Sequence, residues 1–373
     1  MNTAKAKLLA QKILDLADVK INGTRPWDIK VHDERFYNRA LTEGSLGLGE
    51  AYVDGWWEAE KLDEFFDHIL RSRLDEKILG DWKTMLWAIG EVIVNKQRKS
   101  KAFEVAEKHY DIGNDLYEKM LDKKKVYTCG YWKNASNLDE AQEAKLDLVC
   151  RKLNLKAGQR ILDIGCGWGS FAKFAAEKYG VSVVGVTVSK EQISWGDELC
   201  KGLPVELHFK DYRDIEGKFD HIVSLGMFEH VGHKNYKTYM KIVSDHLKDD
   251  GLFLLHTIGI NYSAKTADPW IEKYIFPNGR VPSAKQITSA IEKLFVMEDW
   301  HSFGADYDKT LLSWFKNFDE NWEKLKPKYG DRFYRMWKYY LLVSAASFRS
   351  RRNQLWQIVL SKDGLVGGYE SIR

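Results

Sequence analysis

The sequence predicts an α/β fold in which a doubly wound sheet of seven strands follows a smaller helical domain. Two observations support this prediction. From residue 103 onward, short apolar segments alternate with amphipathic ones, as strands and helices do in a doubly wound sheet. The residues before them instead show the periodicity of helices. We place the boundary at the basic run of residues 96–101, which gives domains over residues 1–102 and 103–373.

Three amphipathic helices are expected in the N-terminal domain, because apolar residues recur there with helical spacing. The apolar face of the first helix consists of Leu9, Ile13, Leu16 and Ala17. The other two helices cover residues 62–70 and 85–93. Such apolar faces either pack together as a core or bind an acyl chain. The periodicity is the same in both cases, and we expect core packing because it is the simpler arrangement. The basic run at 96–101 is either a solvated helix end or a contact for anionic lipid headgroups.

The central motif of the second domain is RILDIGCGWG at residues 160–169, which combines a strand with a tight glycine turn. A helix is expected directly after it, over residues 170–179. Its glycines let the backbone approach a ligand closely, and the start of the helix directs amides toward that ligand. The spacing is Gly-x-Gly-x-Gly, which differs from the dinucleotide fingerprint, and Asp163 beside the turn repels pyrophosphate but suits a cationic group. The pattern resembles the S-adenosylmethionine site of class I methyltransferases, and on that resemblance we favour a cofactor site over a purely structural turn.

Further strands and helices surround this motif. Strands are expected at residues 181–186, 205–210, 219–225, 252–258, 295–303 and 355–361. Helices are expected at residues 137–153, from 189 onward, and at 236–247, 310–326 and 332–349. Capping boxes formed by Asn137 with Glu140 and by Ser189 with Gln192 mark two of the helix starts. The resulting seven strands fit one sheet.

Composition and charge exclude several classes of protein. The 57 basic and 54 acidic residues leave a net charge of +3, so no general electrostatic field favours nucleic acid. No apolar segment reaches the roughly 18 residues of a membrane span, so any membrane contact is expected to be peripheral. Residues 1–17 lack the apolar core of a signal peptide, and the four cysteines form no Cys-x-x-Cys pair. We expect a cytoplasmic protein with reduced thiols.

Polar side chains follow the second and third strands of the expected sheet, at the edge where ligands bind in open α/β sheets. Thr187 and Ser189 stand where many nucleotide-binding folds place an acid for the ribose hydroxyls. These hydroxyls or the side chain of Gln192 would have to replace that acid. Asp211 and Tyr212 follow the third strand, where they either flank an adenine or form an ordinary polar turn.

Glu229 and His256 follow the fourth and fifth strands, at the same edge of the sheet. A lone histidine near an apolar run is usually a satisfied core group, but a pair with Glu229 is a candidate for holding an anion that carries a proton. His230 and His233 are possible metal ligands, yet no cysteine or carboxylate completes a familiar ligand spacing. We therefore expect no metal.

Taken together, these motifs resemble those of the cyclopropane-fatty-acyl-phospholipid synthases, a family of class I methyltransferases similar to mycolic acid cyclopropane synthases. The resemblance covers nearly the whole chain, and it is specific because the motifs share one order and spacing. The C-terminal motifs are HYDIGND at 109–115, YTCGYW at 127–132, LDIGCGWG at 162–169, GMFEHVG at 226–232, LHTIG at 255–259, YIFPNG at 274–279 and FGADY at 303–307. The N-terminal motifs are EGSLGLGE at 43–50 and DGWW at 54–57.

The resemblance implies an activity, a fold and partners. S-adenosylmethionine would donate a methylene group across a cis double bond in an acyl chain of a membrane phospholipid. The fold would be a Rossmann-like catalytic domain with an N-terminal lipid-binding domain. The protein would be a cytoplasmic homodimer that associates peripherally with the inner face of the membrane.

The resemblance also implies roles for individual residues. The side chains of Cys129, Glu229, His256 and Tyr307 and the backbone of Ile258 would hold a bicarbonate ion that serves as the general base. The cofactor would be surrounded by Tyr127, Thr128, Gly165, Gly167, Thr187, Gln192, Asp211 and Tyr212, beside Asp163 and Ser189 from the motifs above. The missing acid after the second strand is then a family trait. The chain departs from some relatives at Ser344, where they carry a cysteine, so a thiol is not essential at that position.

Two other functions remain open at this point. A simple methyltransferase that acts on an amine or a fatty acyl chain would share the sheet and the glycine turn. A lipid-surface binding or regulatory module would also carry the glycine turn, but its cofactor site would be vestigial and would no longer bind the cofactor. The intact Asp163, glycines, Glu229 and His256 argue against such a vestige.

Overall fold

The computed structural model describes residues 2–74, 113–264 and 266–373, and these residues form two compact units. One unit contains Met1–Val94, Lys265–Pro277 and Asp308–Asn353, and the other contains Asn95–Ala264, Asn278–Tyr307 and Gln354–Arg373, as far as these residues are described. The division therefore differs from the single boundary expected after residue 102. The helix expected at 85–93 and the basic run at 96–101 lie outside the described residues.

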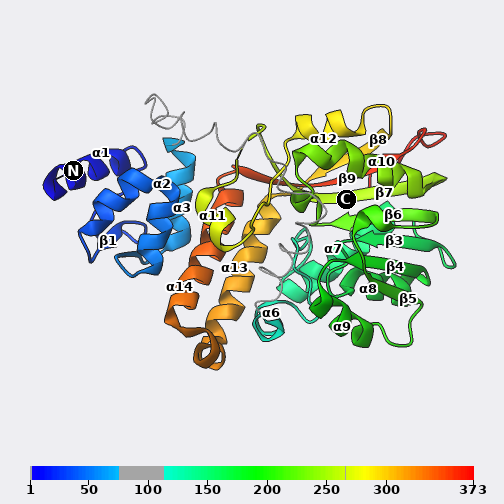
Figure 1. The fold of residues 1–373 in the computed structure, drawn as a ribbon, viewed down its shortest axis with the longest axis horizontal. Helices are drawn as coiled ribbons and strands as arrows, with labels where there is room; N and C mark the ends of the chain where they lie inside the picture. Colours follow the sequence, from blue (N-terminus) through cyan, green and yellow to red (C-terminus); the bar gives the residue numbers. More distant parts are fainter. Residues whose placement is uncertain (1, 75–112, 265) are drawn as a thin grey trace. The chain divides into compact units, whose positions relative to one another are not determined.

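The second unit contains the expected sheet of seven strands, in the order β5-β4-β3-β6-β7-β9-β8 (Figure 1). The strands are β3 Arg160–Ile164, β4 Ser182–Thr187, β5 Val205–Phe209, β6 Phe219–Leu225, β7 Leu247–Ile260, β8 Val296–Ser302 and β9 Asn353–Ser361. The pairs from β5 to β7 are parallel, whereas β8 and β9 are antiparallel, so the sheet is mixed. The predicted α/β fold is thus confirmed.

Helices cover both faces of this sheet. They are α7 Leu138–Lys152, α8 Ser170–Tyr179, α9 Lys190–Leu199, α10 Tyr236–His246 and α12 Ala284–Ile291. The short helix α6 Asn114–Met120 belongs to the same unit. The neighbouring β3 residues Ile161 and Leu162 belong to two different apolar clusters, because successive strand residues point to opposite faces. Asn137 and Ser189 cap α7 and α9 by accepting hydrogen bonds from the amides of Glu140 and Gln192, which confirms both predicted helix starts.

The first unit is mainly helical. Its elements are α1 Thr3–Asp15, β1 Ile29–Val31, α2 Arg35–Val53, β2 Trp57–Ala59, α3 Leu62–Arg71, α11 Pro269–Tyr274, most of α13 Ala305–Glu320, and α14 Trp322–Arg349. α14 contacts both α2 and α3, which explains why it joins this unit although it follows the sheet in sequence. The backbone of α14 is broken at Gly330, where φ is 73°, close to the expected gap between two helices. No helix in the described part of the chain combines the length and the apolar character needed to cross a bilayer.

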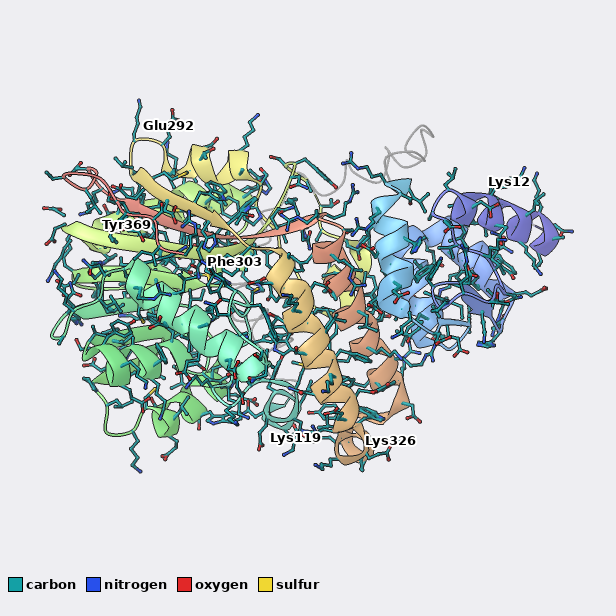
Figure 2. All side chains as sticks on the ribbon, turned by 180° about the vertical axis from the view of Figure 1, so that it is seen from behind. Lys12, Lys119, Glu292, Phe303, Lys326 and Tyr369 are labelled. Carbon is teal, nitrogen blue, oxygen red and sulfur yellow. The ribbon has the colours of Figure 1, made fainter. Side chains whose placement is uncertain are left out.

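The apolar face predicted for α1 is confirmed at Ala17, which is 4% exposed, but it is wrong at Leu9 and Leu16. Leu9 and Leu16 are 42% and 52% exposed, and the helix instead turns Ala6 and Ala10 toward the interior. α1 contacts α2, and the small alanine side chains allow the two helices to approach closely. The leucines therefore belong to the outer face of α1, from which Lys12 also projects (Figure 2).

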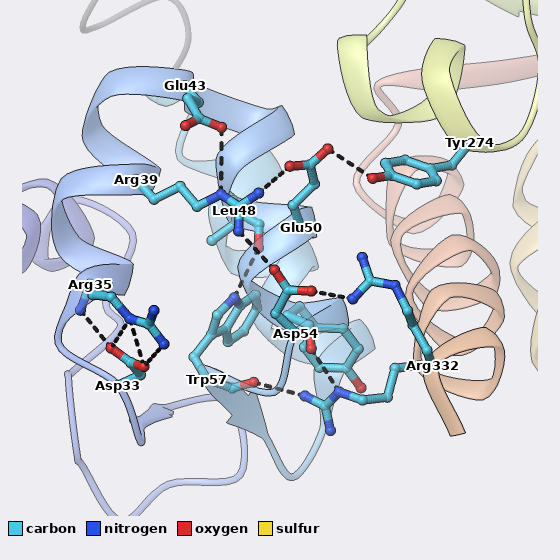
Figure 3. A network of polar contacts seen from close by, with 12 residues as sticks. Asp33, Arg35, Arg39, Glu43, Leu48, Glu50, Asp54, Trp57, Tyr274 and Arg332 are labelled. Carbon is cyan, nitrogen blue, oxygen red and sulfur yellow. Dashed lines mark hydrogen bonds and ion pairs between the residues drawn. The ribbon is translucent and has the colours of Figure 1, made fainter. Parts of the chain in front are cut away.

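A network of charged groups joins α2 to α11 and α14 within the first unit (Figure 3). Glu50 of α2 accepts hydrogen bonds from Lys273 at 2.5 Å and from the Tyr274 hydroxyl at 2.8 Å, and it also pairs with Arg39. Asp54 pairs with Arg39 and with Arg332 of α14. Although burial opposes ionisation, these partners hold the pKa of Glu50 below its usual value. The network therefore fixes two returning segments to the N-terminal helices.

Candidate active site

The glycine turn after β3 has the conformation that its sequence requires. Gly165, Gly167 and Gly169 have φ values of 82°, 55° and 79°, a region that other residues rarely adopt. A Cβ atom at Gly165 would also lie 2.6 Å from the Cβ of Met227, which follows β6. The glycine turn itself therefore lies close to the segment after β6.

A cavity of about 180 Å³ lies at this turn, within the second unit. All ten residues that we predicted around the cofactor line it. They are Tyr127, Thr128, Asp163, Gly165, Gly167, Thr187, Ser189, Gln192, Asp211 and Tyr212. Their gathering confirms that these segments meet, while their role in binding a cofactor stays a prediction.

The acid beside the turn is buried and incompletely partnered. Asp163 is 1% exposed, and its Oδ1 atom has no hydrogen-bond partner among the described residues. Burial raises the pKa of Asp163 to about 7, and the nearby Lys145 opposes this shift. A cationic ligand group in the cavity would supply the missing partner, so the residues present fit the positively charged sulfonium cofactor.

Thr187 is the last residue of β4, and it contacts Gln192, the other residue expected to replace the missing acid. The Thr187 hydroxyl donates to Gln192 Oε1 at 2.7 Å, which orients the amide of that side chain. Asp211, after β5, accepts a hydrogen bond from the amide of Arg213 at 2.9 Å. Asp211 therefore acts as a helix cap, as the polar-turn interpretation predicted, and it also lines the cavity.

Lys145 is a charged residue of this cavity that sequence reasoning missed. It lies on α7, is 0% exposed, and donates from Nζ to the Thr128 hydroxyl at 2.8 Å. Its position carries a signal, because Ala141 and Val149, one turn before and one turn after it on α7, are both buried. A lysine on the buried side of a helix needs a polar partner inside.

Glu229 and Ile258 meet beyond the ends of β6 and β7. Glu229 lies on a short 3-10 helix, Phe228–His230, between two cavity-lining residues, Met227 and His230. The amide of Ile258 donates to Glu229 Oε1 at 2.6 Å. We expected that amide to donate to a bound anion, so its partner in the structure differs from the expected one. Burial raises the pKa of Glu229 to about 7.

His256 is buried two residues before Ile258, and β7 aligns it with Leu225 at the end of β6. Its Nδ1 lies 3.3 Å from Nε2 of Gln357, a buried β9 residue that sequence reasoning missed. Burial holds the pKa of His256 well below its usual value, so the ring is neutral. Since the Gln357 amide donates to Nδ1, the proton of the ring lies on Nε2. Both His256 Nε2 and Glu229 Oε2 lack a partner among the described residues.

Cys129 and Tyr307 are both buried in the same unit. The segment of Cys129 contacts both the residue after β6 and the segment of Tyr307. A Cβ atom at Gly226, just after β6, would lie 2.7 Å from the side chain of Thr128. The amide of Trp132 donates to Asp306 at 2.7 Å, beside Tyr307. The segments are thus neighbours, while the place of these two side chains at an anion stays a prediction.

No three histidine, cysteine or acidic side chains gather as a metal site would require, within the described ranges. Burial lowers the pKa of His230 to about 4, so this cavity-lining ring is neutral. The expected absence of a metal stays a prediction.

The strand order, the glycine turn and the cavity beyond it define a class I S-adenosylmethionine-dependent methyltransferase. The solved mycolic acid cyclopropane synthase CmaA1, complexed with SAH and CTAB, shares this fold with a TM-score of 0.66 and 31% identity, over 70% of this chain and 98% of that one. The sequence model of the family described as Mycolic acid cyclopropane synthetase matches residues 97–358. The chain belongs to this family, which confirms the resemblance.

Two curated relatives are similar over much of their length. The cyclopropane-fatty-acyl-phospholipid synthase of Escherichia coli strain K12 is 51% identical over 365 residues, which cover 98% of this chain and 95% of the relative. A probable fatty acid methyltransferase of Pseudomonas putida is 38% identical over 275 residues, 70% of each chain.

Proposed function

We propose that this enzyme transfers a methylene group from S-adenosylmethionine to the cis double bond of an unsaturated acyl chain in a membrane phospholipid, forming a cyclopropane ring. The similarity to the Escherichia coli relative over almost the full chain supports this substrate class. The reaction type rests on one observation: Glu229 and His256 are buried next to cavity-lining residues, and each leaves one polar atom without a partner in the described part of the chain. Methyl transfer to an amine that already has a free lone pair needs no such group, whereas ring closure must remove a proton from the transferred methyl group.

The chemistry explains why such a group is needed. An alkene is a weak nucleophile, so it must lie in line with the methyl group at about 3–3.5 Å. Its attack produces a carbocation, which closes to a ring only when the transferred methyl group loses a proton. A base must therefore lie within hydrogen-bond reach. Water would capture the cation, so the site must exclude it.

We propose that bicarbonate binds at the two orphaned atoms, where it supplies the base. Neutral His256 donates from Nε2, and the Glu229 carboxylate accepts from the hydroxyl of the anion through Oε2. The Ile258 amide supports this arrangement because its bond to Oε1 fixes the carboxylate. Cys129 and Tyr307 complete the proposed anion site.

The N-terminal domain is proposed to contact the phospholipid surface, with the protein acting as a peripheral homodimer at the inner face of the membrane. The outer face of α1 supports the membrane contact. Leu8 is 60% exposed there, together with Leu9 and Leu16, and Lys5 and Lys12 lie on the same side. Such a face can insert leucines among lipid headgroups while its lysines approach anionic phosphates.

The direct test is incubation of the purified protein with S-adenosylmethionine and vesicles of phospholipid that carries cis-unsaturated chains. Released acyl chains are analysed by mass spectrometry before and after catalytic hydrogenation. We expect the mass of the acyl chain to increase by one CH2. The product should take up no hydrogen under mild hydrogenation that reduces double bonds but leaves a cyclopropane ring intact. A product of the same mass that still takes up hydrogen would instead favour a methyltransferase like the Pseudomonas putida relative.

A further inference from the structure

We propose that Lys145 binds the α-carboxylate of the methionine part of S-adenosylmethionine, while Asp163 faces its ammonium group. This inference rests on the proposed function, because it assumes that the cosubstrate occupies the cavity at the glycine turn. It adds a ligand contact that the sequence motifs do not assign.

The first argument is the burial of a charge that forms no direct ion pair among the described contacts. Lys145 is 0% exposed and lines the cavity. Its hydrogen-bond partner in the described part of the chain is the neutral Thr128 hydroxyl, and no ion pair involves its Nζ there. A buried ammonium group without a hydrogen-bonded anion is costly, so a ligand that brings a carboxylate within hydrogen-bond distance gains affinity.

The charge state of Lys145 fits such a ligand. Burial lowers the pKa of Lys145 to about 8, and Asp122 and Asp163 oppose the shift. The side chain therefore remains mostly protonated at neutral pH. S-adenosylmethionine and S-adenosylhomocysteine each contain one anionic group, the amino-acid carboxylate, so that group is the partner available to the lysine.

Asp163 supplies the complementary charge. Both side chains line the same cavity and interact electrostatically, yet no ion pair joins them among the described contacts. A cation and an anion that line one cavity without a direct ion pair fit a zwitterionic amino-acid group, whose carboxylate and ammonium lie on one carbon atom. The incomplete hydrogen bonding of Asp163 Oδ1 is consistent with this ligand.

A purely structural role for Lys145 is the competing explanation, because its bond to Thr128 anchors the segment that contains Tyr127. That segment already has an anchor from α7. Gln142, also fully buried, donates to the Thr128 carbonyl at 2.7 Å. Holding the segment therefore does not require a charged side chain at position 145.

The test compares two ligands in each protein variant by calorimetry: S-adenosylhomocysteine and its decarboxylated analogue. We expect the wild type to bind the first ligand more tightly by on the order of 10- to 100-fold, as for a hydrogen bond to a charged group. In Lys145→Met this ratio should fall to about one, mainly because S-adenosylhomocysteine binds more weakly. Lys145→Arg should retain part of the preference.

Lys152→Met is the matched control. Lys152 is a second fully buried lysine on α7, but its ion pair with Asp299 lies outside the cavity lining. This variant should keep the wild-type ratio. A Lys145→Met protein that loses affinity for both ligands equally, or a wild type that does not distinguish them, would overturn the role of Lys145 and leave the cofactor site intact. A wild type that binds neither ligand would overturn the proposed function itself.

Discussion

The amide of Ile258 and Oε1 of Glu229 form a hydrogen bond of 2.6 Å. This bond ties the end of β7 to the short helix after β6, and it aims the remaining oxygen of Glu229 at a position without a described partner. A carboxylate that is fixed through one oxygen and open through the other is suited to accept a hydrogen bond from a ligand. The proposed anion site depends on this arrangement.

Replacement of Glu229 tests that arrangement. We expect Glu229→Gln to lower turnover by roughly 10²- to 10⁴-fold. The neutral amide is a weaker hydrogen-bond acceptor than the carboxylate, so it holds the hydroxyl of the anion less firmly. S-adenosylhomocysteine affinity should stay near the wild-type value. Turnover on vesicles and calorimetry separate the two effects, and full activity in this variant would remove the proposed role.

Gln357 is expected to act as a positioning residue for His256. Gln357→Leu removes the donor to Nδ1, so the ring loses its fixed tautomer and turnover should fall by about 10- to 100-fold. Gln357→Glu should instead raise the pKa of His256 and shift the pH profile of turnover. If both variants keep the wild-type rate and pH profile, Gln357 has no such function.

Asp163 should lower the stability of the free protein at neutral and basic pH. Because its folded pKa is raised to about 7 from 3.8, its contribution favours folding at low pH and is lost as the pH rises toward 7. Asp163→Asn should therefore stabilise the protein at pH 8, by up to a few kcal/mol on the scale of about 1.4 kcal/mol per pKa unit, and have less effect near pH 4. Urea unfolding at both values measures this. An equal effect at the two pH values would contradict the shifted pKa.

The charged network of the first unit predicts a stability difference between two glutamates that share Arg39. Glu50→Ala should cost about 3 kcal/mol, because it leaves a buried cluster without its central anion. Glu43→Ala should cost less than about 1 kcal/mol, since the 3.5 Å pair of Glu43 with Arg39 is partly exposed. Denaturant unfolding of the full chain measures both. Similar losses in the two variants would show that the network is not centred on Glu50.

The outer face of α1 predicts a binding defect without a folding defect. Replacing Leu8 and Leu16 by serine should weaken sedimentation with anionic vesicles by tenfold or more, because each inserted leucine contributes roughly 1.5–3 kcal/mol. The melting temperature should not fall. Val366→Ser, which removes an exposed apolar side chain of the C-terminal tail, serves as the control. Equal vesicle binding by all three proteins would exclude α1 as the contact.

The sequence predicts the sheet well because its strands contain short apolar segments, such as those of β4 and β7, that are followed by turn or polar residues. Asp163, Thr187 and Asp211 could be assigned to one cavity because the carboxyl ends of parallel strands share an edge. The buried face of α1 could not be predicted from the sequence. Alanines and leucines both recur with helical spacing along that helix, and only the packing shows which of them are buried. Lys145 and Gln357 lie among apolar residues of their elements. Their roles could not be predicted, because they depend on the polar groups that the fold places opposite them.

Transfer from S-adenosylmethionine with a CD3 methyl group tests the central claim most directly. Vesicles of cis-unsaturated phospholipid are the acceptor, and NMR and mass spectrometry follow the product. Ring closure after loss of one deuteron predicts a CD2 group in a cyclopropane ring and the loss of the olefinic signals. A chain that carries an intact CD3 branch, or no label, would contradict the proposed reaction.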